Sequence, residues 1–202
     1  MSKRPETFTE RYDHLKKVLQ SKWFLEKQGL GNEVPFFICP YPPAEAFKME
    51  AGIDTYLTKP LAQQGITALH LNLYDLSIEI LKEADCFEQI LEEEPHFSKD
   101  ELMEILQNTL DSESALIPKI AEKTAEQPFD ILFLSGVGEV FPYIRSHNVL
   151  NNLQSTVKEQ PTVLFFPGEY SHSKDRGREL NLFGIMVDDE YYRAFNIFDY
   201  QV

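Results

Sequence analysis

The chain has 202 residues, of which 43% are hydrophobic and 12% aromatic, enough to fill the core of one domain and to exclude a wholly disordered protein. Its apolar runs are far too short to cross a bilayer, and we expect no secretion signal because no apolar segment follows the charged N-terminus. The formal net charge of −14 opposes broad binding to the phosphates of nucleic acids.

The first third of the chain predicts helices and strands in alternation. Apolar residues at helical spacing predict a helix over residues 5–28, and the run at 34–39 predicts the first strand. A second helical pattern covers 44–64, with a break or kink expected next to Pro60. Strict alternation over 66–73 predicts a strand with one wetter face, near an edge of the sheet.

Residues 76–126 form an acidic region with helical periodicity. They include 14 Asp and Glu residues against 4 Lys and Arg residues. Ser98, followed by Glu101 three positions later, predicts a capping box at the start of a helix. We expect an insertion of three short helices, whose acidic side is either a solvated face or a docking surface for a basic partner.

The strongest strand signals lie in the second half of the chain. Residues 131–134 and 163–166 are short runs that are apolar at every position, which is typical of strands covered on both faces. Between them, 139–158 has the length of a helical crossover, which we expect in two pieces, and such a unit makes parallel strands. Residues 180–187 predict a last strand or hairpin arm.

Together these elements predict a single α/β domain over residues 1–202 with a helical insertion at 76–126. The mostly parallel sheet should have about five strands and helices on both faces. Ligands of parallel sheets bind beyond the C-terminal ends of the strands, which here are followed by the loops 135–138 and 167–178. We expect 171–179 to be a polar, flexible part of the second loop.

Two glycines of the first loop, Gly136 and Gly138, follow a strand and precede a helix, where backbone N–H groups can cradle a phosphate. However, the chain contains no GxxxxGK[ST] string, and Phe141 stands where a dinucleotide fingerprint needs its third glycine. The two glycines therefore form either an anion-binding loop or a tight turn, and the turn is the simpler interpretation.

Basic side chains give two further candidate sites. Arg145 and Arg193 stand among apolar residues, so we expect each to pair with a carboxylate or carbonyl group, as a structural contact or as a contact to an anion or partner. Lys174, Arg176 and Arg178 form a candidate basic patch for a nucleic-acid accessory role, which the acidic balance opposes. No His or Cys spacing indicates a metal site, and we expect no cofactor and no catalytic set. The two cysteines without a CxxC neighbour favour a reduced, cytoplasmic protein.

Six stretches carry a resemblance to a known family. They are FLSGVG at 133–138, FPYIRSH at 141–147, LNNL at 150–153, LFFPGEY at 164–170, LFG at 182–184 and YYRAFNI at 191–197. In this order they resemble BrxB, a family of small components of the BREX phage-defence systems of bacteria and archaea. Within these stretches the candidate partner-contact or structural residues are Phe141, Arg145, His147, Tyr170, Tyr191, Tyr192 and Arg193.

The resemblance implies an accessory protein in a multi-subunit antiviral machine that also contains a methyltransferase, a large ATPase and PglZ, an alkaline-phosphatase-like protein. It implies PglZ as the first partner to expect and a core similar to a P-loop NTPase without nucleotide motifs; the short apolar runs already argue against a membrane partner. No catalytic residue is carried over from the family. The leading hypothesis is a non-enzymatic subunit for protein–protein interaction and assembly. The alternatives are a degenerate nucleotide- or anion-binding regulatory subunit and a nucleic-acid accessory protein.

Overall fold

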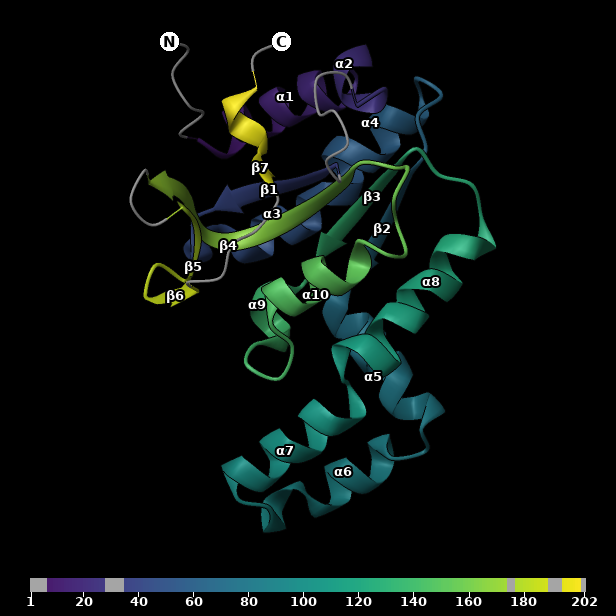
Figure 1. Ribbon diagram of the computed structural model, residues 1–202, viewed down its shortest axis with the longest axis vertical. Helices are drawn as coiled ribbons and strands as arrows, with labels where there is room; N and C mark the ends of the chain where they lie inside the picture. The colour runs from purple at the N-terminus through teal and green to yellow at the C-terminus, as the bar shows by residue number, and fades with distance from the viewer. Residues whose placement is uncertain (1–6, 28–34, 174–176, 189–193, 201–202) are drawn as a thin grey trace.

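Five parallel strands form the centre of the computed structural model, which describes residues 7–27, 35–173, 177–188 and 194–200 (Figure 1). The parallel strands are β1 (Phe36–Tyr41), β2 (Ala68–Asn72), β3 (Ile131–Ser135), β4 (Thr162–Ser173) and β7 (Phe195–Asn196). Their order in the sheet is β2-β3-β4-β1-β7. The predicted α/β class with a mostly parallel sheet is confirmed, and β2 lies at an edge as its alternating pattern indicated. The likeness to a P-loop NTPase core stays a prediction.

Helices cover both faces of this sheet (Figure 1). One face carries α1 (Phe8–Leu19), α2 (Lys22–Leu25), α3 (Ala46–Gly52), the π-helical η2 (Ile53–Thr58), α4 (Lys59–Ala62) and η5 (Ile197–Asp199), with the short η1 (Pro43–Glu45) leading into α3. The other face carries α5 (Leu73–Glu83), the π-helical η4 (Ser112–Leu116), α8 (Ile117–Glu126), α9 (Val137–Val140) and α10 (Ser146–Leu153). None of the helices in the described ranges has the length and apolar content needed to cross a bilayer.

Alternate residues of each central strand enter two separate cores. In β1, Phe37 and Cys39 face the core that contains α1 and α3, whereas Phe36 and Ile38 face the core that contains α5 and α8. All four side chains are buried. Because successive side chains of a strand point to opposite faces, a strand covered on both sides is apolar at every position. This is the physical reason for the short apolar runs in the sequence.

Most helix predictions agree with the structure, with changes at the boundaries. The pattern over 5–28 gives two helices, because Ser21 caps a new helix by accepting a hydrogen bond from the N–H of Phe24. The chain stays helical through Pro60, where a break or kink was expected; the helix changes type there, from the π-helical η2 to α4, which begins with that proline in its first turn. The crossover between β3 and β4 is in two pieces, α9 and α10, as predicted.

The loop predicted at 167–178 is wrong for the residues described there, because β4 continues through Pro167 to Ser173. Up to Pro167, β4 pairs with β1 in parallel, and from Gly168 onward it pairs with β5 (Gly177–Leu182) in antiparallel. β6 (Met186–Asp188) then pairs with β5. The flexible segment expected at 171–179 is therefore strand on both sides of 174–176, which lie outside the described residues. The strand continues past the proline because β5 provides backbone hydrogen-bond partners for the residues that follow it.

The acidic insertion has one helix more than predicted. Its base consists of α5 and α8, which pack on the sheet, and its tip consists of α6 (Phe87–Glu93), η3 (Glu94–His96) and α7 (Lys99–Thr109), which extend away from it (Figure 1). The capping box is confirmed, since the N–H of Glu101 donates to Ser98 Oγ over 3.2 Å and the N–H of Ser98 donates to Glu101 Oε2 over 2.8 Å.

Candidate functional site

Polar side chains converge at the carboxyl edge of the sheet, where β2 and β3 end. Asn72 and Ser135 are the last residues of the two strands and are paired in register. His70 lies on the same side of β2 as Asn72, because side chains two positions apart share a face. Helix α3 brings Glu50 to these residues. Ligands of parallel sheets bind at this edge, so the group is the candidate site.

Hydrogen bonds join the members of this group. Ser135 Oγ donates to Glu50 Oε1 over 2.7 Å, and Asn72 Nδ2 donates to the same oxygen over 2.8 Å. His70 Nε2 lies 2.8 Å from Ser135 Oγ. Because the single hydroxyl proton of Ser135 goes to Glu50, the Nε2–H of His70 is the donor to Ser135. The oxygen of the Asn72 amide accepts from the backbone N–H groups of Tyr74 and Asp75 and so caps α5.

The electrostatics of the site favour a neutral histidine among carboxylates. Burial lowers the pKa of His70, while the charges of Glu50, Asp54 and Asp75 act in the opposite direction. Burial also raises the pKa of Glu139, and the charge of Glu50 raises it further. The potential at this edge is therefore negative, which suits a cationic group better than an anion.

The geometry holds the strand ends together and does not activate a nucleophile. Ser135 is fully buried, and its hydroxyl group donates a hydrogen bond to Glu50 and accepts one from His70, whereas nucleophilic catalysis needs a histidine that accepts the hydroxyl hydrogen. Cys39 is also fully buried, and burial raises the pKa of its thiol, so its reactive thiolate is disfavoured. No group of three or more His, Cys, Asp or Glu side chains within the described ranges is placed to hold a metal ion.

The two glycines that precede and begin α9 serve close packing. Gly136 has φ +77°, and a Cβ there would lie 2.4 Å from Asn72 Oδ1. A Cβ on Gly138 would lie 3.0 Å from the side chains of Phe183 and Pro167. The turn interpretation therefore has a physical basis, because side chains occupy the space beside both glycines. Anion binding at this turn stays a prediction.

A hollow of about 350 Å³ lies further along the same edge, where β1 and β7 end and β4 changes its partner from β1 to β5. Its lining includes Tyr41, Glu169 and Asn196, together with the buried Arg11 of α1. Arg11 forms an ion pair with Glu45, which offsets the cost of burying its charge. The hollow therefore has a paired cation among its lining residues, together with the carboxylate of Glu169.

Three of the candidate partner or structural residues have contacts inside the protein. Tyr170 is 6% exposed, and its hydroxyl group donates to the carbonyl oxygen of Ala194 over 2.6 Å. The ring of Phe141 meets Phe183 edge to face, with ring centroids 6.4 Å apart. His147 is buried in the first turn of α10. These positions support structural roles.

Arg145 differs from the expectation. It is exposed, although the residues on either side, Ile144 and Ser146, are buried. The expected pairing in apolar surroundings is wrong for this residue, because the turn before α10 directs it to solvent; a partner contact stays a prediction. Five other candidates lie outside the described residues: Lys174, Arg176, Tyr191, Tyr192 and Arg193. Arg178 is part of β5, but its side chain is not described.

Several residues of the site escaped the sequence analysis. Glu50 and Asn72 carried no motif, and Ser135 entered only as part of the stretch 133–138 and the loop 135–138, with no role of its own. Asn72 had one usable signal, because an Asn directly before a helical pattern is a preferred N-cap. The others become visible only when the strands and α3 are assembled.

The chain is similar to proteins of one named family. The family model described as BREX protein BrxB matches residues 69–197. A relative named BREX protein BrxB from Bacillus cereus (strain H3081.97) is 36% identical over 196 residues, which covers 94% of this chain and 97% of the relative. A relative of the same name from Escherichia coli O9:H4 (strain HS) is 27% identical over 187 residues, or 93% of this chain and 90% of the relative. No solved structure matches the chain.

Proposed function

Since this chain belongs to the BrxB family of BREX proteins, we propose that it is a non-enzymatic subunit of a phage-defence system that holds other components together. The observation that carries the proposal is that the protein's own side chains fill the carboxyl edge of the sheet at β2 and β3. There Glu50, Asn72 and Ser135 bond to one another, and Ser135 is fully buried. An edge filled by its own side chains leaves protein contact as the function that the geometry supports best.

Exposed apolar side chains support an interaction role. Phe47 is 86% exposed, one helical turn before Glu50 on α3, and Tyr74 is 43% exposed in the first turn of α5. Large aromatic side chains are enriched in protein–protein interfaces. Ile185 is 77% exposed in the turn between β5 and β6, and Leu91 is 51% exposed on α6. These residues give the subunit more than one surface for partners.

The first partner that we propose is a PglZ-like protein with an alkaline-phosphatase fold, met in the cytoplasm, because the family resemblance implies such a neighbour. The alternative of an anion-binding regulatory subunit at Gly136 and Gly138 is disfavoured by the carboxylates of Glu50 and Glu139 beside that turn. This alternative predicts that millimolar ATP or GTP raises the melting temperature of the protein.

Co-expression tests the proposal. The tagged chain is expressed with the PglZ-like protein and the other BREX components of its own system, and the purified material is analysed by mass spectrometry and light scattering. We expect at least one component to co-purify in a fixed ratio and to be absent from a tag-only control. Purification of the chain alone at low salt would contradict the proposal, and so would turnover of a nucleotide that is lost in Ser135→Ala.

A further inference from the structure

The tip of the acidic insertion, residues 86–110, is here called the acidic lobe. It forms the end of the molecule opposite α1 and η5 (Figure 1). Neither α6 nor α7 contains a buried residue. A globular helix normally buries an apolar stripe, and one side of the lobe does rest on the core through residues such as Phe87 and Leu106. Other apolar side chains of the lobe remain in reach of solvent, among them Leu91, which is 51% exposed.

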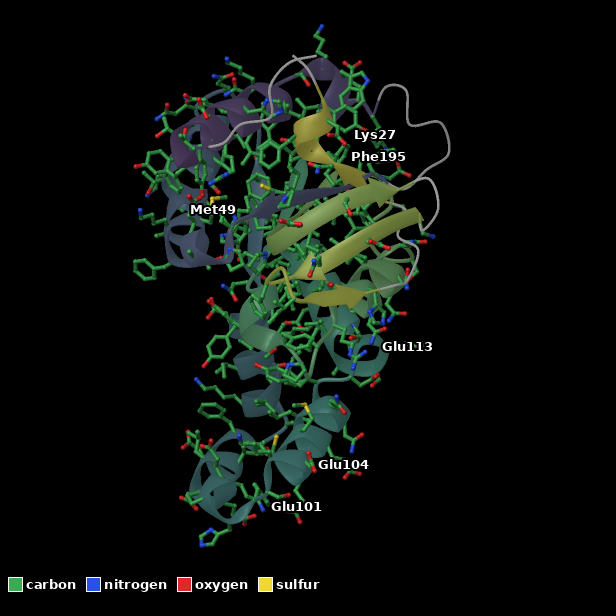
Figure 2. The ribbon with its side chains drawn as sticks, turned by 90° about the vertical axis from the view of Figure 1, so that its left-hand side faces the viewer. Lys27, Met49, Glu101, Glu104, Glu113 and Phe195 are labelled. Carbon is green, nitrogen blue, oxygen red and sulfur yellow. The ribbon has the colours of Figure 1, made fainter. Side chains whose placement is uncertain are left out.

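A groove of about 360 Å³ lies along α7 in this lobe. Its lining consists of Phe97, Glu101, Glu104, Ile105 and Asn108. The last four stand at positions i, i+3, i+4 and i+7 of α7 and so form one stripe. Figure 2 shows Glu101 and Glu104 on this helix at the free end of the molecule. The groove therefore has two apolar side chains with carboxylates beside them.

The charge of the lobe is uncompensated. It contains seven Asp and Glu residues and one Lys. At the base of the insertion, Lys119 pairs with Glu79, Glu83 and Glu122. In the described part of the chain, no ion pair joins a carboxylate of the lobe to a Lys or Arg. The backbone N–H of Ser98 holds Glu101 in place and lowers its pKa, so this carboxylate stays ionised near neutral pH.

We propose that the groove of the acidic lobe binds a basic amphipathic segment of a partner protein. The apolar side chain of that segment would lie on Phe97 and Ile105, and its Lys or Arg residues would meet Glu101 and Glu104. Nucleic acids and anionic lipids do not fit, because the lobe repels phosphate groups. The inference rests on the proposed function and adds the chemistry of the partner.

A matched pair of variants tests the groove with a defined probe. Glu104→Lys with Ile105→Ser changes the groove and leaves the capping box of Glu101 intact. Glu113→Lys makes the same change of charge on an exposed residue of η4 outside the groove (Figure 2). The probe is a labelled synthetic amphipathic peptide of Lys and Leu, compared with a peptide of Glu and Leu by fluorescence anisotropy.

We expect the wild-type chain and Glu113→Lys to bind the Lys peptide with the same affinity, and the groove variant to bind about tenfold more weakly, as the loss of one good interface contact implies. The Glu peptide should not bind. Equal binding by the groove variant, or no binding of the Lys peptide by the wild-type chain, would overturn the inference. Circular dichroism checks that both variants are folded.

The co-expression experiment separates this inference from the proposed function. If the wild-type chain retains a BREX component and the groove variant releases it while Glu113→Lys retains it, both stand. If the groove variant retains the component as well as the wild-type chain does, the lobe is not the docking surface and the proposed function is unaffected. If the wild-type chain binds the Lys peptide through the groove but no BREX component co-purifies, the proposed function fails, whereas the inference that the groove binds a basic amphipathic segment stands.

Discussion

Replacing Gly168 with alanine tests the close approach of β4 and β5, on which the hairpin depends. A Cβ on Gly168 would lie 2.1 Å from the carbonyl oxygen of Asn181 and 2.9 Å from Cε1 of Phe166. Since real Cβ contacts stay at or above 3.0 Å, the backbone of β5 would have to retreat from β4. Overpacking costs about 1–3 kcal/mol, and each ladder hydrogen bond that is lost adds about 1 kcal/mol. We therefore expect the free energy of unfolding to fall by about 3 kcal/mol.

Urea and thermal unfolding, followed by circular dichroism, measure this loss. For a chain of this size, about 3 kcal/mol corresponds to a melting temperature lowered by about 6–12 °C. Gly65→Ala is the matched control, because Gly65 has φ +79° with no atom within 4 Å of its Cβ position, so it reports backbone strain alone, about 1 kcal/mol. If Gly168→Ala proves no more destabilising than Gly65→Ala, the close approach of β4 and β5 is refuted.

Three further predictions concern the hydrogen bonds of the carboxyl edge and the C-terminal strand. Ser135→Ala removes the bond to the carboxylate of Glu50 and should lower the free energy of unfolding by about 1.5–3 kcal/mol in urea titrations; an unchanged midpoint would contradict this. Burial lowers the pKa of His70, so the unfolded state binds more protons below about pH 6.5 and stability falls toward about pH 5. His70→Asn should reduce this loss of stability at low pH. If the stability of the variant depends on pH as that of the wild-type chain does, His70 is not a buried neutral histidine. Tyr170→Phe loses the bond to the carbonyl of Ala194 and should cost about 1 kcal/mol in thermal scans; equal melting temperatures would show that this bond adds nothing.

Local patterns in the sequence predicted the centre of the fold well. The apolar runs at β3 and at the first half of β4 have a single physical cause, since both strands are covered on two faces. The alternation at β2 likewise follows from its place at the edge of the sheet. The capping box at Ser98 and Glu101 was predictable because both partners lie within one helical turn.

Features that depend on distant residues were not predictable. Pro167 and Gly168 read as the end of a strand, because the sequence does not show that β5 returns to pair with the segment beyond them. The candidate site joins Glu50 to Asn72 and Ser135, which are 22 and 85 residues away in the chain. No periodicity records such a meeting, since it arises from the sheet order that places α3 beside the ends of β2 and β3.

The acidic insertion leaves the sheet at the end of β2 and returns to it at the start of β3. These two strands are direct neighbours, with Ala68 opposite Ile131. Because the two strands are parallel, the chain leaves at the carboxyl end of β2 and returns at the amino end of β3, and the base helices α5 and α8 cover that distance on the face of the sheet. Residues can be gained or lost at the far end of the insertion without shifting the register of a single strand. Sequence changes at the tip of the insertion can consequently alter which partner protein it binds while the sheet keeps its structure.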